Sequence, residues 1–221
     1  MAGGRLFVVA APSGGGKTSL VKALLARESN LRVCVSHTTR TRRPTEVEGR
    51  DYHFVSRERF QELVAANAFV EHAAVFDNFY GTSRQALEEA FGRGCDAILE
   101  IDWQGARQVR QRAADCISIF ILPPSRIALE QRLHDRRTDS PEVIERRLRD
   151  AVADMTHYDE FEFTVVNDDF ATAVAELESI IRGGAEHLRS NRPALKPLIA
   201  ELTADGPQKA PSDWRKNPPI A

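Results

Sequence analysis

The fold of this chain is decided near its start, where the sequence reads Leu6-Phe7-Val8-Val9-Ala10-Ala11-Pro12-Ser13-Gly14-Gly15-Gly16-Lys17-Thr18. A short apolar run with the character of a buried strand leads into a glycine-rich loop, and Lys-Thr then opens a helical pattern. Glycines let the backbone of such a loop approach phosphate oxygens closely. The N-terminus of the following helix adds the positive end of a dipole. The stretch therefore predicts a strand, a phosphate-binding loop and a helix.

Residues 11–18 match the P-loop pattern G-x-x-x-x-G-K-[ST] except at Ala11, which stands where the pattern has glycine. A methyl group is a small change, so we keep the interpretation. In P-loops the lysine reaches the β- and γ-phosphates and the next hydroxyl faces Mg²⁺. We expect Lys17 and Thr18 to have these roles toward a nucleoside triphosphate. A glycine-rich turn without a ligand is the alternative, and the strand and helix around the loop disfavour it.

Bulk composition narrows the class of protein. The chain has 221 residues, of which 42% are hydrophobic and 28% charged, as in a globular domain with room for insertions. Its net charge of −2 provides no field that favours nucleic acid. Neither a signal peptide nor a membrane-spanning run is expected. Cys34, Cys95 and Cys116 lack metal-ligand spacing, so we expect buried free thiols and a cytoplasmic location.

Apolar strand patterns alternate with helical patterns along most of the chain, which predicts an α/β fold with a parallel sheet flanked by helices. The strands are expected at 5–10, 31–35, 95–101, 116–122 and 161–167, and the helices at 18–28, 104–113, 125–136, 140–157 and 170–182. Residues 36–90 mix short strands and helices with many polar residues, and this predicts an inserted mixed α/β subdomain. Pro207, Pro211, Pro218 and Pro219 predict an extended or disordered end.

Two groups of arginines are candidates for phosphate binding. Arg40, Arg42 and Arg43 follow a core strand, at the edge where doubly wound sheets bind ligands. Arg132 and Arg136 are four residues apart on one helix and resemble part of a lid that closes over a transferred phosphoryl group. Solvated basic surfaces are the alternative for both groups.

Two acids follow the central strand predicted at 95–101. Carboxylates such as Glu100 and Asp102 can order the waters of Mg²⁺ or contact a substrate. For one of the pair, a cap for the next helix is the alternative.

Six segments, together with the P-loop, resemble guanylate kinases in order and spacing, over about residues 4 to 185. They are Ser36-His37-Thr38-Thr39-Arg40-Thr41-Arg42-Arg43-Pro44, Glu48-Gly49-Arg50-Asp51-Tyr52, Phe69-Val70-Glu71-His72, Tyr80-Gly81-Thr82, Ile101-Asp102-Trp103-Gln104-Gly105 and Val166-Asn167-Asp168-Asp169.

The resemblance implies transfer of the ATP γ-phosphate to GMP, and by extension dGMP, with Mg²⁺ accompanying ATP, in purine nucleotide metabolism. It implies a P-loop core at 1–36, 91–125 and 156–185, a GMP-binding subdomain at 37–90 and a helical lid at 126–155. Residues 186–221 are expected to form a C-terminal extension, partly extended or disordered, outside the resemblance. It leaves the oligomeric state open and implies neither a nucleic-acid nor a membrane partner.

The resemblance also assigns roles to residues of this chain. The implied ATP-binding residues are Ala11, Pro12, Ser13, Gly14, Gly15, Gly16, Lys17, Thr18 and Asn167, the last beside adenine. The implied GMP-binding residues are Ser36, Arg40, Arg43, Tyr52, Glu71, Tyr80, Thr82, Glu100 and Asp102. The implied catalytic residues are Lys17, Arg40, Arg132, Arg136 and Arg147, and whether Arg146 or Arg147 makes the lid contact stays open.

The guanine-reading role of Glu71 also has a chemical basis. Guanine presents N1–H and N2–H₂ donors side by side, which match the two oxygens of one carboxylate, whereas adenine presents an unprotonated N1. Leaving a buried charged acceptor unpaired costs about 1–3 kcal/mol or more. The hydroxyls of Ser36 and Thr82 can donate to guanine O6. A surface acid on an edge strand is the alternative for Glu71.

Two other functions remain open at this point. A related kinase acting on a ribose phosphate would share the P-loop and lid but need no guanine reader. A non-catalytic guanylate-kinase-like binding domain would be expected to have a damaged P-loop, and here Gly16-Lys17-Thr18 is intact.

Overall fold

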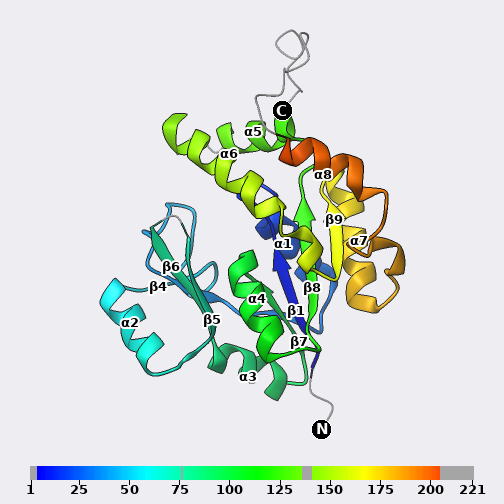
Figure 1. Cartoon of the computed structure of the whole chain (residues 1–221). Helices are drawn as coiled ribbons and strands as arrows, with labels where there is room; N and C mark the ends of the chain where they lie inside the picture. Colours follow the sequence, from blue (N-terminus) through cyan, green and yellow to red (C-terminus); the bar gives the residue numbers. More distant parts are fainter. Residues whose placement is uncertain (1–3, 76, 136–140, 205–221) are drawn as a thin grey trace.

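The computed structural model describes residues 4–75, 77–135 and 141–204. Its centre is a sheet of five parallel strands in the order β2-β7-β1-β8-β9, which we call the large sheet (Figure 1). Its strands are β1 (Leu6–Ala10), β2 (Leu31–Val33), β7 (Asp96–Glu100), β8 (Ile117–Leu122) and β9 (Phe163–Val166). Parallel order between consecutive strands requires helical crossovers, so the predicted α/β class is confirmed.

Both faces of the large sheet are buried, because side chains of one strand alternate between two apolar clusters. Along β1, Phe7 and Val9 pack with α1 (Lys17–Arg27) and α7 (Phe170–Arg182). Leu6 and Val8 pack in the cluster on the other side. The helices of that cluster are α3 (Arg84–Gly92), α4 (Trp103–Arg112), α5 (Arg126–His134), α6 (Pro141–Met155) and α8 (Leu195–Thr203).

A second sheet of four strands, the small sheet, lies beside the large one in the order β4-β3-β6-β5 (Figure 1). Its strands are β3 (Ser36–Thr38), β4 (His53–Phe54), β5 (Phe69–Val75) and β6 (Asn78–Ser83), and α2 (Arg57–Ala65) packs on it. Phe60 of α2 stacks between Phe69 and Phe79, with ring centroids 4.7 and 5.5 Å away. This confirms the mixed character predicted for residues 36–90.

Side-chain hydrogen bonds attach the small sheet to α4. Gln108 Nε2 donates to His72 O at 2.7 Å, and Arg112 donates to Val70 O. The edge strand β5 is therefore held against the helix that follows β7, and this brings the small sheet to the C-terminal edge of the large one.

The described part of the C-terminal extension contains regular structure. The prediction for residues 186–221 is a partly extended or disordered segment, and within it residues 186–204 form a 3₁₀ turn, η2 (Glu186–Leu188), and helix α8 (Leu195–Thr203). Leu195 and Leu202 of α8 are buried in the cluster that also holds Ile144 of α6. The four large aliphatic residues of α8 recur at helical spacing, at Leu195, Leu198, Ile199 and Leu202. Pro197 concealed this pattern, yet proline is tolerated in a first turn because its missing N–H has no partner there. The prolines from Pro207 onward lie outside the described residues.

None of the helices in the described ranges is both long enough and apolar enough to cross a membrane.

Candidate functional site

The P-loop lies where β1 ends, at the centre of the large sheet. Its backbone turns through Gly14 and Gly16, whose φ angles of 87° and 90° lie in the left-handed region that favours glycine. Gly15 N donates to Pro12 O at 2.9 Å and closes the turn. The predicted succession of strand, loop and helix is confirmed, and the triphosphate ligand stays a prediction.

Lys17 begins α1 and extends toward the next strand, where its Nζ donates to Ile101 O at 2.7 Å. Burial lowers the pKa of Lys17, and the negative charges of Glu100, Asp102 and Glu71 act in the opposite direction. Lys17 therefore lies among carboxylates of both sheets, and their charges oppose the effect of burial on its pKa.

Thr18 and Glu100 carry the side-chain oxygen atoms that we consider for contact with Mg²⁺. The two side chains are hydrogen-bonded, and burial raises the pKa of Glu100. Among residues 4–75, 77–135 and 141–204, no group of three or more His, Cys, Asp or Glu is placed to hold a metal.

Asp102 is the N-cap of α4, and its Oδ1 accepts from Gly105 N at 2.8 Å. The alternative of a helix cap is therefore confirmed for Asp102. Its carboxylate still contributes to the field around Lys17.

The small sheet brings together the three residues expected to read guanine, because Ser36, Thr82 and Glu71 are paired in register across β3, β6 and β5. Ser36 Oγ and Thr82 Oγ1 are 2.9 Å apart. Glu71 Oε1 accepts from Thr82 N at 2.9 Å and from Thr82 Oγ1 at 2.7 Å. All three side chains are buried, which is unusual for such a polar set.

Burial raises the pKa of Glu71 to about 7, and the nearby Asp102 charge adds to the effect. Its second oxygen, Oε2, lies against the backbone of Gly105, where a Cβ atom would be only 2.5 Å away. Because Gly105 has no side chain, the Glu71 carboxylate can occupy the space beside it. Sequence reasoning quoted Gly105 in a motif but assigned it no role, because a glycine inside a helix carries no sign of what lies opposite.

The residues expected to hold the GMP phosphate also lie together. The Arg40 guanidinium stands 5.4 Å from the Tyr52 ring centroid and is hydrogen-bonded to Tyr80. The rings of Tyr52 and Tyr80 are 5.9 Å apart in an edge-on arrangement. A guanidinium beside two phenols provides the donors that a phosphate needs.

Glu46 belongs to this cluster and was missed by sequence reasoning. Its Oε1 lies 2.7 Å from Arg40 Nη2, and its Oε2 accepts from Arg43 N at 2.8 Å. Burial alone would raise the pKa of Glu46, but the hydrogen bonds from Arg40 and Arg43 lower it below its usual range. The available signal was an acid six residues after Arg40 in an otherwise basic loop.

On the opposite side, Arg132 of α5 donates from Nη2 to Asn167 O at 2.8 Å. Its Nη1 is buried and has no hydrogen-bond partner among the described residues, which is costly for a charged group. Arg147 lies half-buried on α6. The neighbouring Arg146 is exposed and reaches Asp77, which precedes β6, with its Nη1 3.3 Å from Asp77 Oδ2. Arg136 lies outside the described residues.

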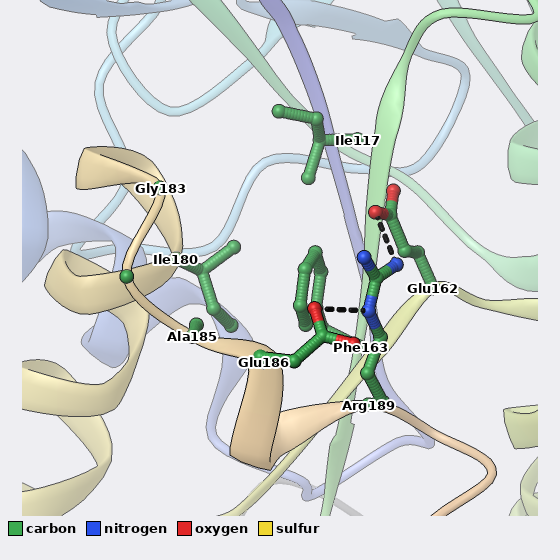
Figure 2. Close-up of a pocket in the computed structure, with 9 residues that line it drawn as sticks. Ile117, Glu162, Phe163, Ile180, Gly183, Ala185, Glu186 and Arg189 are labelled. Carbon is green, nitrogen blue, oxygen red and sulfur yellow. Dashed lines mark hydrogen bonds and ion pairs between the residues drawn. The ribbon is translucent and has the colours of Figure 1, made fainter.

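A surface hollow of about 460 Å³ lies at the other end of the large sheet, where β8 and β9 begin (Figure 2). The guanidinium of Arg189 lies between two acids there, 2.6 Å from Glu162 Oε1 and 3.0 Å from Glu186 Oε2. Two acids surround this one arginine, whereas Arg40 and Arg43 share the one acid Glu46, so this hollow is the poorer phosphate site. The candidate site is the edge where the P-loop faces the small sheet.

A parallel sheet with a glycine-rich loop and lysine after its central strand defines an α/β P-loop protein. A family model described as guanylate kinase matches residues 3–183. The chain belongs to the guanylate kinase family. Curated guanylate kinases from Alkalilimnicola ehrlichii and Escherichia coli K12 are 52% and 51% identical to it, over 90% and 93% of this chain and 98% and 100% of theirs. A crystal structure of guanylate kinase from Anaplasma phagocytophilum is similar with a TM-score of 0.69 and 32% identity, covering 92% of this chain and 98% of that one.

Proposed function

We propose that this chain transfers the γ-phosphoryl group of ATP to GMP, and also to dGMP, giving ADP and the corresponding diphosphate. The observation that carries the proposal is the buried set of Ser36, Thr82 and Glu71 on the small sheet, close enough to the P-loop for Glu71 to influence the pKa of Lys17. The buried set on the small sheet suits a purine with two adjacent N–H donors, and the P-loop suits a triphosphate.

In the proposed reaction an oxygen of the GMP phosphate attacks the γ-phosphorus in line with the leaving ADP. No general base is needed, because that oxygen is already anionic near neutral pH. Lys17, Arg132, Arg136 and Arg147 offset the charge on the transferred group, and Arg40, Arg43, Tyr52 and Tyr80 hold the attacking phosphate. Catalysis then consists of positioning and electrostatic stabilisation.

Mg²⁺ supplies further neutralisation of phosphate charge when it is bound with ATP, and Thr18 is the residue we assign to it. We assign the ATP phosphates to residues 11–18, and Glu100 and Asp102 to the GMP side. We place the reaction in the cytoplasm, which is consistent with three buried free cysteines.

A coupled assay with ATP as donor and GMP, dGMP, AMP or ribose phosphates as acceptors tests the function. We expect GMP to be the best acceptor. Faster turnover of AMP would contradict the role of Glu71, and faster turnover of a ribose phosphate would favour the related kinase. Tight GMP binding without turnover of any acceptor would indicate a binding domain.

A further inference from the structure

Asn167 connects three parts of the molecule at the end of β9. Its backbone N donates to Leu122 O at 2.8 Å, which continues the pairing of β9 with β8. Its carbonyl oxygen accepts from Arg132 Nη2 at 2.8 Å. Its side-chain Nδ2 donates to Gly15 O in the P-loop at 2.9 Å. The residue is buried, with only 5% of its surface exposed.

The amide of Asn167 lies directly against the P-loop backbone. A Cβ atom on Gly16 would stand 2.3 Å from Asn167 Nδ2, so a side chain at that position would displace the amide. Gly16 is therefore constrained twice, by its φ of 90° and by this contact. Such a close approach indicates that the amide and the loop are fitted to each other.

The hydrogen bond from Asn167 to the Gly15 carbonyl also fixes the direction of the Gly16 N–H. The peptide bond is planar and trans, so the C=O of Gly15 and the N–H of Gly16 point in opposite directions. While Asn167 holds the carbonyl, the Gly15–Gly16 peptide cannot turn over. The N–H of Gly16 then keeps the direction in which the loop presents it. Backbone N–H groups of such loops are the donors that surround phosphate.

We propose that Asn167 is a positioning residue of the P-loop, which orients the Gly15–Gly16 peptide for triphosphate binding and links that peptide to Arg132. The proposal deepens the proposed function and rests on its assignment of the P-loop to the donor nucleotide. It differs from a contact with adenine in the group that is held, because the side-chain N–H of Asn167 donates to the P-loop carbonyl of Gly15.

Inorganic triphosphate separates the two roles, since it carries the phosphates without a base. We expect Asn167→Ala to weaken the binding of both ATP and inorganic triphosphate by about tenfold, as measured by calorimetry with Mg²⁺ present. Binding of GMP should be unchanged. Asn167→Gln keeps an amide donor on a longer side chain and should recover part of the loss. Asn191→Ala, at an exposed asparagine before α8, is the matched control and should change none of these affinities.

Weaker binding of ATP with unchanged binding of inorganic triphosphate would overturn the proposal and assign Asn167 to adenine. Unchanged binding of both would also overturn it. If Asn167→Ala does not fold, Asn167→Ser is measured with the same two ligands and judged by the same outcomes. A wild-type protein that binds both ligands but does not phosphorylate GMP would contradict the proposed function and leave this inference testable.

Discussion

The two sheets of this protein bury different kinds of residues. In the large sheet every residue of β1 is buried and apolar. In the small sheet the buried residues include Ser36, Thr38, Glu71 and Thr82. Burying apolar residues contributes about 1.5–3 kcal/mol for each large side chain, whereas buried polar groups contribute little net stability once they are hydrogen-bonded.

This difference indicates that the large sheet contributes mainly to stability and the small sheet mainly to ligand recognition. The large sheet fixes the P-loop on a close-packed support, and the small sheet holds buried polar groups that can form hydrogen bonds with a ligand. Substitutions near the P-loop should therefore affect the rate of reaction, and substitutions in the small sheet should affect the choice and binding of GMP.

The largest effect is expected from Lys17→Ala, which removes the cation at the edge of the large sheet. We expect kcat to fall by about a thousandfold or more, because a preorganised charge on the transferred group is lost. Removing Lys17 also leaves Glu100, Asp102 and Glu71 without this nearby cation, so the thermal unfolding of the variant is measured beside its rate. Lys22→Ala, an exposed lysine on the same helix, is the control, and near-normal turnover of Lys17→Ala would contradict the mechanism.

Glu71→Gln tests the small sheet. The amide offers guanine one acceptor and one donor in place of two acceptors, so kcat/KM for GMP should fall by about 10- to 100-fold. Discrimination against AMP should weaken in parallel. Assays of GMP and AMP measure both effects, and Glu62→Gln on the exposed face of α2 is the control. Unchanged preference for GMP would show that guanine is read elsewhere.

Gly105→Ala should weaken GMP binding without lowering thermal stability. The new methyl group would come within 2.5 Å of Glu71 Oε2 and displace the carboxylate. We expect KM for GMP to rise by about tenfold, equivalent to ~1.4 kcal/mol, with KM for ATP unchanged. Alanine is the better helix former, so thermal stability should hold. Gly92→Ala, where nothing lies within 4 Å of the added Cβ, is the control.

Glu46→Gln should give the smallest change in KM for GMP. The direction of that change shows whether Glu46 orients Arg40 or competes with the GMP phosphate. If the carboxylate orients Arg40, KM for GMP should rise by about three- to tenfold, because a charged hydrogen bond becomes a neutral one. Asp51→Asn, which removes an acid from the same loop, is the comparison. A lower KM in Glu46→Gln would show instead that the carboxylate competes with the GMP phosphate.

Much of the large sheet could be predicted because its strands are continuous apolar runs and its helices have clear caps. The helix expected at 125–136 begins at a serine cap, with Ala128 N donating to Ser125 Oγ at 3.1 Å. The positions of Ser36, Thr82 and Glu71 opposite one another could be expected only through the family resemblance, since three short strands far apart in sequence must pair in one register.

What the sequence did not reveal depends on contacts that have no local signature. Glu46 gains its role only when the basic loop folds back on itself. Gly105 matters because of the residue facing it. Helix α8 was concealed by Pro197, whose position in a first turn cannot be recognised until the start of the helix is known. In each case the decisive information is the identity of a neighbour in space.

The burial of Glu71 has a consequence for the heat of ligand binding. With a pKa of about 7, this carboxyl is protonated below neutral pH and ionised above it. Guanine donors require the ionised form, so GMP binding must expel a proton from the molecules that still carry one. At pH 7 about half a proton per site should pass to the buffer, and by pH 8.5 almost none. The calorimetric enthalpy of GMP binding should therefore vary with the ionisation heat of the buffer at pH 7 and become independent of it in alkaline solution.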